Sequence, residues 1–335
     1  FIIFLSLLIF FPTNENIIKI GFLSTLTGGN SALGISTKNG LLLALEEINS
    51  NGGILNKKVE ILIEDDKNDV NTAKDIVSKF KKANVSGIIG PAISNVAVKI
   101  ISDLEKDKLF AIGTSVSTNE LSDRKDNFLR LSPSNSLVAA SMAEFMYLKK
   151  DIKNVAVVYD TSNEAYAKDY YLDFKAAYQK IGGKIVGVET FFSSNDVLYN
   201  QLLYKLLESK PQAIFLITNP LDAAAFCRNL RRFDQDTQIF LSSWSYAEEL
   251  LQYGGISLEN VYITIVFDRE LKTENYLKFK QNYQKKYLSQ PDHRALYGYE
   301  AIYIIVDAIE KSNSLEPMRI KEEILKTSQF NILRE

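Results

Sequence analysis

The sequence predicts an α/β protein made of two lobes, each a doubly wound parallel sheet, joined by a hinge. From residue 17 onward, short apolar runs alternate with longer amphipathic segments, which is the pattern of parallel strands connected by helices. A polar, proline-containing stretch at residues 128–136 interrupts this series and separates two similar halves. At 335 residues the chain is long enough for two domains of ordinary size, so each half has the length for its own core.

Eight segments are predicted as buried strands because they are apolar almost without a break. They begin at Ile17, Lys58, Val85, Lys108, Asn154, Lys184, Gln212 and Gln238. The segments between them have helical spacing. In the segment from Ile35, for example, one side of the helix would carry Leu41, Leu42, Leu45 and Ile48.

The two lobes are predicted to be discontinuous in sequence. The chain crosses to the second lobe at residues 128–136 and returns near residues 263–270, because no new strand separates the helices expected at 275–288 and 295–311. The first lobe would then comprise residues 14–132 and 267–320. The second would comprise residues 133–266 and 321–335.

The first thirteen residues are different in kind. An apolar run at residues 1–11, closed by Pro12 and Thr13, suits the core of a signal peptide and is shorter than the roughly 20 residues of a membrane-spanning helix. We expect residues 1–13 to be a signal peptide core or a truncated anchor, with the protein exported to a periplasmic or other extracytoplasmic location. One cysteine, Cys227, leaves no internal disulfide to form.

Composition excludes several functions. With 46% apolar and 24% charged residues the balance is that of a globular protein, and a net charge of −2 gives no basic field for nucleic acid. One histidine and one cysteine cannot supply a zinc site, so no metal or other cofactor is expected. The acidic residues 64–66 are predicted to be a polar strand end.

A glycine-rich loop follows the first strand. Gly29, Gly34 and Ser36 fit the frame of a phosphate-binding loop, but Ile35 stands where its lysine should be. Without that charge a nucleotide site is not predicted. A turn remains that leads into a helix whose free N–H groups can face a small anion.

An enzyme is a weaker alternative. Ser115 lies in G-x-S-x-S, which lacks the second glycine of a nucleophile elbow, and His293 comes later in the chain. His293 lies in the polar start of a predicted helix, where we expect it to be solvated. A serine amidase or esterase is therefore the least favoured interpretation.

Several segments, taken in order, resemble the type I periplasmic solute-binding proteins, the family of branched-chain amino acid (leucine/isoleucine/valine) binding proteins of ABC transporters. The resemblance extends from about residue 17 to the end and implies two α/β lobes joined by three crossovers. It rests on the opening residues 18–54 and then on GIIGPAISNVAVKI, FAIGTSVSTNELS, VVYDTSNEAYAKDY and LYGYEAIYIIVDAIEKS.

The resemblance implies a set of ligand-binding residues. Ser94 would bind a ligand carboxylate at a helix N-terminus, and Val116 and Ser117, next to Ser115, would hold the ammonium and carboxylate through a carbonyl and a hydroxyl. Tyr166 would cover the ligand from the second lobe. The alternatives are helix N-caps for the serines and a half-buried helix position for Tyr166.

The chain also departs from the family pattern. Leu33 stands where an aromatic residue often precedes the loop glycine, and Asn119 replaces a proline. The acid that clamps a ligand ammonium falls at or beside Trp244, with Glu248 nearby. Trp244 is predicted as either a ligand wall or a core residue, and an α-amino acid ligand is accordingly in question.

The predicted function is that of an exported solute-binding protein of an ABC-type importer, which closes two lobes on an amino acid or related small carboxylate and catalyses no reaction. Its expected partners are this ligand and a membrane permease, and the protein is expected to be a monomer. The alternative is a ligand-sensing receptor ectodomain of the same fold.

Overall fold

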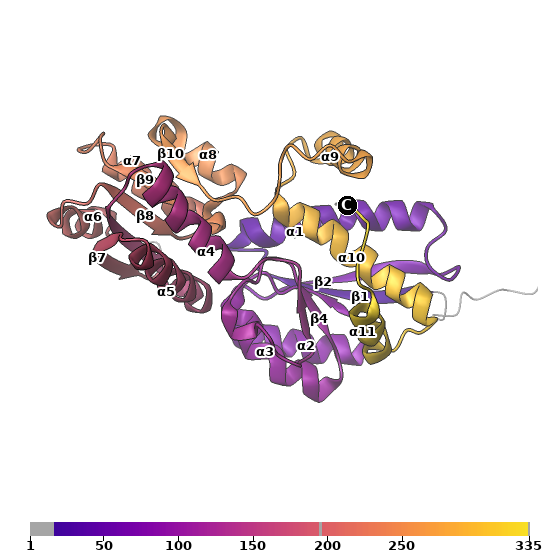
Figure 1. Ribbon diagram of the computed structural model, residues 1–335. Coiled ribbons are helices and arrows are strands. Elements are labelled where there is room, and N and C mark those ends of the chain that lie inside the picture. The colour runs from indigo at the N-terminus through magenta and orange to yellow at the C-terminus, as the bar shows by residue number, and fades with distance from the viewer. Residues whose placement is uncertain (1–16, 194–195, 334–335) are drawn as a thin grey trace, which may run out of the picture.

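The protein is described by a computed structural model over residues 17–193 and 196–333. The expected signal peptide core or anchor at residues 1–13 lies outside the described residues. Two lobes lie side by side, each with one five-stranded parallel sheet flanked by helices (Figure 1). The predicted fold class is confirmed.

The first lobe is built on a sheet in which every neighbouring pair of strands is parallel. Helices cover both faces, because most of its strands are apolar on both sides. In sheet order its strands are β2 (Lys58–Asp65), β1 (Ile17–Ser24), β3 (Ile88–Ile89), β4 (Ala111–Gly113) and β5 (Phe128–Arg130). One face packs on α2 (Val70–Lys82) and α3 (Ser94–Asp107). The other packs on α1 (Ser31–Ser50), α9 (Glu274–Tyr287), α10 (His293–Ser312) and α11 (Pro317–Lys326).

The second lobe repeats this plan with its own parallel sheet. In sheet order its strands are β10 (Val261–Ile263), β9 (Gln238–Leu241), β8 (Ala213–Ile217), β6 (Asn154–Asp160) and β7 (Lys184–Phe191). The face that continues the core of the first lobe carries α4 (Asn135–Glu144) and α5 (Glu164–Lys180). The opposite face carries α6 (Tyr199–Glu208), α7 (Pro220–Leu230) and α8 (Glu248–Gly254).

Two strands were not among the eight predicted from apolar runs. β5 and β10 have three residues each and form the last edge strand of their sheets, directly before the chain leaves the lobe. β5 falls inside the first stretch that was interpreted as a crossover, at residues 128–136, and β10 ends at the first residue of the second, at residues 263–270. A three-residue edge strand followed by a crossover has neither the apolar length nor the following helix that mark the other strands.

The C-terminal segment differs from the prediction for residues 321–335. Instead of entering the second lobe, residues 321–333 stay with the first: Ile324 and Leu333 are buried in its core, and the Thr273 hydroxyl donates to the Leu333 carbonyl at 2.7 Å. Within the described residues the chain therefore crosses between the lobes twice, not the three times that the resemblance implied. The amphipathic face of α11 is covered by α10, which explains why this helix remains on the first lobe.

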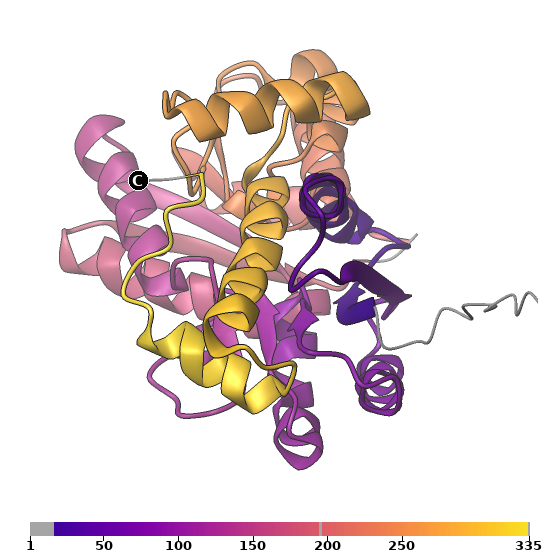
Figure 2. The ribbon, with the colours of Figure 1, turned by 90° about the vertical axis from the view of Figure 1, so that its right-hand side faces the viewer.

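Close packing of α1 on α10 fixes the start of α10 at the boundary between the lobes, and in Figure 2 α1 is seen almost end-on beside α10. Two glycines make this contact possible. A Cβ atom on Gly40 would lie 1.8 Å from the Ala295 carbonyl oxygen, and one on Gly298 would lie 2.1 Å from that of Thr37. Any larger residue would push the helices apart and move the first turn of α10.

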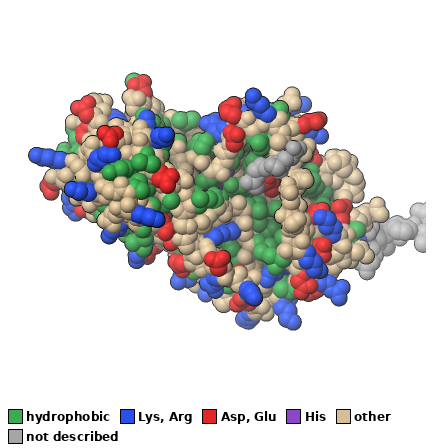
Figure 3. Space-filling view, viewed as in Figure 1, with side chains coloured by type: hydrophobic (Ala, Val, Ile, Leu, Met, Phe, Trp, Pro, Cys, Tyr) green, Lys and Arg blue, Asp and Glu red, His purple; other side chains and the backbone are tan. Residues whose placement is uncertain are grey.

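Acidic and basic side chains are interspersed over the visible face of both lobes (Figure 3). No helix in the described ranges combines the length and the apolar character needed to cross a bilayer. The same residues contain no group of three or more His, Cys, Asp or Glu side chains placed to hold a metal ion.

Candidate functional site

A small cavity of about 30 Å³ lies between the two lobes. It is formed where the carboxyl ends of strands from both sheets meet the first turns of α1, α4, α5 and α10, which is where open α/β sheets bind ligands. In this closed arrangement a molecule of several heavy atoms fits only if the lobes or the surrounding side chains move. The lining residues are Leu33, Ala92, Ser115, Ser117, Ser132, Pro133, Asn135, Val138, Asn163, Tyr166, Tyr170, Ser243, Trp244, Val266, His293 and Arg294.

The acidic end of β2 shapes the glycine-rich loop. Asp66 accepts the Thr25 hydroxyl at 2.6 Å, and Asp65 accepts the N–H of Leu26 at 2.8 Å. These bonds fold the chain after β1 back toward α1, where the Thr25 carbonyl leaves no room for a Cβ atom on Gly34. The two carboxylates thus stabilise the conformation of this turn, which places Leu33 at the cavity wall.

Of the predicted first-lobe residues, Leu33, Ser115 and Ser117 line the cavity, whereas Ser94 and Val116 do not. Val116 is fully buried in the core behind the site. Ser94 is also buried, and its hydroxyl oxygen lies 3.5 Å from the N–H of Ser117. Ser94 and Val116 therefore support the cavity wall from behind, and their predicted contact with a ligand stays a prediction.

Ser115 and Ser117 differ in how their hydroxyls are used. The Ser117 hydroxyl donates to Asn135 Oδ1 at 2.8 Å, whereas the buried Ser115 hydroxyl has no hydrogen-bond partner among the described residues. The Ser115 hydroxyl is thus the one left to meet a ligand.

We expect Ser115→Ala to weaken binding of a carboxylate by about tenfold or more, because a hydrogen bond to a charged group contributes about 1.5–3 kcal/mol. The free energy of unfolding should change by less than about 0.5 kcal/mol, since no bond within the protein is lost. Ser117→Ala is the matched control and should lower stability by about 1 kcal/mol. Calorimetry measures the carboxylate affinity of both variants, and urea denaturation measures their free energy of unfolding. A Ser115→Ala variant that binds the carboxylate like the parent would contradict this prediction.

Tyr166 and Trp244 form the aromatic wall on the second lobe. Their rings meet edge to face with centroids 5.5 Å apart, and both side chains are at most 5% exposed. Trp244 lies in a short 3-10 turn after β9, so its ring enters the cavity from the carboxyl end of that strand. The described lining of the cavity contains no acidic side chain at this wall: Glu248 does not belong to it, and its side chain accepts a hydrogen bond from Gln252.

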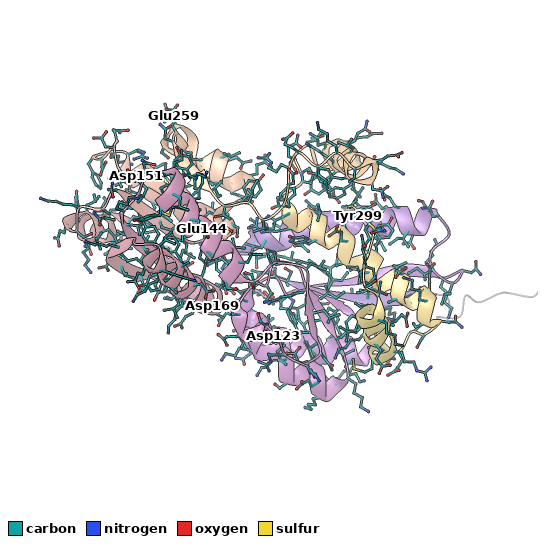
Figure 4. The ribbon with its side chains drawn as sticks, viewed as in Figure 1. Asp123, Glu144, Asp151, Asp169, Glu259 and Tyr299 are labelled. Atoms are coloured by element: carbon teal, nitrogen blue, oxygen red, sulfur yellow. The ribbon has the colours of Figure 1, made fainter. Side chains whose placement is uncertain are left out.

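Polar bonds tie the lobes together beside the cavity. Asp169 of α5, labelled in Figure 4, accepts the N–H of Asn119 at 2.8 Å and the Asn135 amide at 3.0 Å. Asn163 accepts the N–H of Asn95 at 3.1 Å, so it occupies a donor at the N-terminus of α3. Asn119, noted as a departure from the family pattern, thus holds the two lobes in contact.

The first turn of α10 projects into the cavity from the first lobe. Asp292 caps the helix by accepting the N–H groups of Arg294 and Ala295, and its second oxygen lies 3.0 Å from Arg294 Nη1. The Arg294 guanidinium reaches the second lobe, where Nη2 donates to the carbonyls of Ser243 (3.1 Å) and Trp244 (3.0 Å) and Nη1 donates to that of Tyr246. One side chain therefore joins both lobes.

His293 is buried at 5% exposure, so the prediction of a solvated histidine is wrong. The close packing of α10 on α1 carries this polar first turn into the interior. Burial, together with the positive charge of Arg294, lowers the pKa of His293 to about 3 against the opposing effect of Asp292. For Asp292, burial acts to raise the pKa, but Arg294, His293 and the hydrogen bonds outweigh it and the pKa is lowered.

Sequence reasoning missed Arg294, Asn135 and Asn163. The signal for Arg294 was present: the helix that follows it is apolar on nearly every side, and a cation in the first turn of such a helix must be buried with a partner. No comparable signal existed for the two asparagines, because each stands in an ordinary helix start.

Comparison with known proteins supports the fold. A family profile described as periplasmic binding protein matches residues 17–333. The Leu/Ile/Val-binding protein BraC3 of Rhizobium johnstonii is 27% identical over 209 residues, which is 62% of this chain and 56% of that protein. The alignment thus spans just over half of that relative's length.

Two solved structures are similar over most of the chain. The leucine-binding protein LivK of Thermotoga maritima is 27% identical with a TM-score of 0.85, and the match covers 94% of this chain and 89% of that protein. An ABC transporter solute-binding protein from R. palustris in complex with benzoate is 17% identical with a TM-score of 0.82, covering 92% and 84% of the two chains.

Proposed function

The chain belongs to the periplasmic binding protein family, and on that premise we propose that it is an exported solute-binding protein that closes its lobes on an amino acid or related small carboxylate. It then delivers this ligand to the membrane permease of an ABC transporter and works as a monomer. The observation that carries the proposal is the interlobe cavity, whose walls come from both lobes and which contains buried polar groups that lack partners within the described residues.

The named relatives support both ligand classes. LivK and BraC3 are named for amino acids, whereas the R. palustris protein holds benzoate, a carboxylate without an ammonium group. The shared group is the carboxylate. In this chain Ser115 is the first-lobe residue at the cavity whose hydroxyl has no partner among the described residues and can receive it.

Binding is favoured over catalysis even though Ser115 and His293 line the same cavity. A serine hydrolase needs a histidine that takes the serine proton and is held by a carboxylate. A pKa of about 3 makes His293 a poor base at neutral pH, and its Nδ1 has no partner among the described residues. The pair therefore provides polar atoms for a ligand and no proton transfer.

We expect ligand to shift the lobes from open to closed, because contacts from the second lobe exist only in the closed state. Small-angle scattering should show a smaller radius of gyration with a bound carboxylate, while far-UV circular dichroism stays unchanged. A compound that does not bind by calorimetry is the control. An unchanged radius of gyration at saturating, calorimetrically confirmed ligand would exclude the closure mechanism.

A further inference from the structure

Two buried groups at the cavity can only donate hydrogen bonds, and neither has an acceptor within the described residues. The first is the indole N–H of Trp244, whose side chain is 3% exposed. The second is Arg294 Nε; the two terminal nitrogens of the same guanidinium bond to Asp292 and to second-lobe carbonyls. Indole and guanidinium N–H groups have no acceptor capacity, so what they meet must supply lone pairs.

The other lining groups that are unpaired among the described residues, which include the hydroxyls of Tyr166 and Tyr170 and Nδ1 of His293, can each act as donor or acceptor, so the donors of Trp244 and Arg294 are the groups that demand an acceptor. The Ser115 hydroxyl can donate or accept, so it adapts to either kind of ligand. No Asp or Glu belongs to the described cavity lining. The carboxylate of Asp292, which precedes the lining residues His293 and Arg294, already accepts hydrogen bonds from Ser36, from Arg294 and from the N–H of Ala295.

An ammonium group is therefore poorly matched to the cavity. It carries three donors and no lone pair, so in a water-excluded site it needs carboxylate or carbonyl partners. At the Trp244 and Arg294 end it would face two further donors and the charge of a guanidinium. A carbonyl or carboxylate that reached these donors would pair with them, and a site with unpaired buried donors discriminates strongly against ligands that cannot pair them.

We propose that this cavity selects organic acids whose second polar group is a hydrogen-bond acceptor, with 2-oxo acids as the leading class, over α-amino acids of the same skeleton. The carboxylate would lie toward Ser115, and the acceptor would meet Trp244 Nε1 and Arg294 Nε. This inference rests on the proposed function, because it requires that the interlobe cavity is the ligand site.

The test compares how tightly the whole chain binds an amino acid and the 2-oxo acid of the same skeleton, measured by calorimetry and thermal shift. The pairs are leucine with 4-methyl-2-oxopentanoate, phenylalanine with phenylpyruvate, and glutamate with 2-oxoglutarate. Each pair exchanges an ammonium for a carbonyl on one skeleton. For at least one pair we expect the 2-oxo acid to bind tenfold or more tightly than its amino acid. 4-Methylpentanoate, which has neither group, should bind between the two members of the leucine pair.

The variant Trp244→Phe keeps an aromatic ring against Tyr166 and removes only the indole and its donor. We expect it to reduce the preference for the 2-oxo acid by about tenfold. The control is Tyr253→Phe, which removes a hydroxyl from an exposed ring that does not line the cavity. If Trp244→Phe does not fold, the preference of the parent protein still decides the question.

The outcomes separate the two proposals. Tighter binding of the amino acids, with closure seen by scattering, would overturn the acceptor rule and leave the solute-binding function standing. If Trp244→Phe keeps the preference for the 2-oxo acid, the indole N–H does not select the ligand, and the proposed pairing of Trp244 Nε1 and Arg294 Nε with the acceptor is wrong. Binding of no acid in the panel, with no change in the radius of gyration, would overturn the proposed function and this inference with it.

Discussion

Replacing Arg294 by methionine is expected to lower the free energy of unfolding by about 3–5 kcal/mol. The Arg294 side chain is 1% exposed and its ionic partner Asp292 is 13% exposed, so the substitution leaves a carboxylate buried without its counterion. Breaking one half of a buried ion pair costs about this much, whereas the intact pair itself contributes little. Methionine fills a similar volume with an apolar, flexible chain, so lost packing is a minor part of the effect.

The double variant Asp292→Asn/Arg294→Met separates charge from packing. Asparagine removes the charge but keeps an oxygen that can cap α10, so the double variant should regain most of the lost stability. Arg319→Met is the matched control: Arg319 pairs with Glu316 at side-chain exposures of 72% and 55%, and the loss should be below about 1 kcal/mol. Urea denaturation measures all three. A single Arg294→Met variant that unfolds like Arg319→Met would show that the pair is not electrostatically coupled.

The same substitution should change the resting lobe angle. Arg294 donates to three carbonyls of the second lobe, and we expect these contacts to exist only while the lobes are closed. Their loss removes part of the free energy that favours closure without ligand. Arg294 thus connects the stability of α10 to the population of the closed state.

Most of the sheet architecture could be predicted from sequence because strands such as β6 and β8 are continuous apolar runs followed by helices. β5 and β10 could not, because a strand of three residues next to a crossover carries no periodic signal. The placement of residues 321–333 depends on which lobe covers an amphipathic helix. Packing of α11 on α10 determines this placement, and the local sequence pattern carries no information about it.

Part of the candidate site was likewise predictable from the sequence and part was not. Ser115, Ser117 and Tyr166 were expected from the resemblance to the family, and Trp244 from its place at the carboxyl end of a strand; all four line the cavity. His293 was misplaced because its polar neighbours indicate a solvated helix start. The glycine contacts that bury this turn join residues more than 250 positions apart, from Gly40 to Ala295. Burial of a polar turn by such a contact is visible only in three dimensions.

The burial of His293 leads to a strong dependence of stability on pH. Its pKa is lowered from 6.5 to about 3, so between these values the unfolded chain binds a proton that the folded protein does not. Stability from this residue is complete above pH 6.5 and is lost as the pH falls, by about 1.4 kcal/mol per unit and about 5 kcal/mol in all. Asp292 and Arg294 flank the ring, and the side chains of Tyr246, Phe267 and Tyr297 surround it.

Asp160 opposes this trend, so the two effects must be separated. Burial raises the pKa of Asp160 from 3.8 to about 6, against its hydrogen bonds to Ser162 and Ser193. Its protonation therefore adds stability as the pH falls from 6 toward 3.8, and the curve of the parent protein is flattened there. His293→Phe keeps an aromatic ring and removes the titration. The free energy of unfolding of the parent minus that of the variant should thus fall by about 3 kcal/mol between pH 6.5 and 4, because the Asp160 contribution cancels. A difference that stays constant over this range would mean that His293 titrates normally, and that the first turn of α10 is open to water instead of closing the cavity.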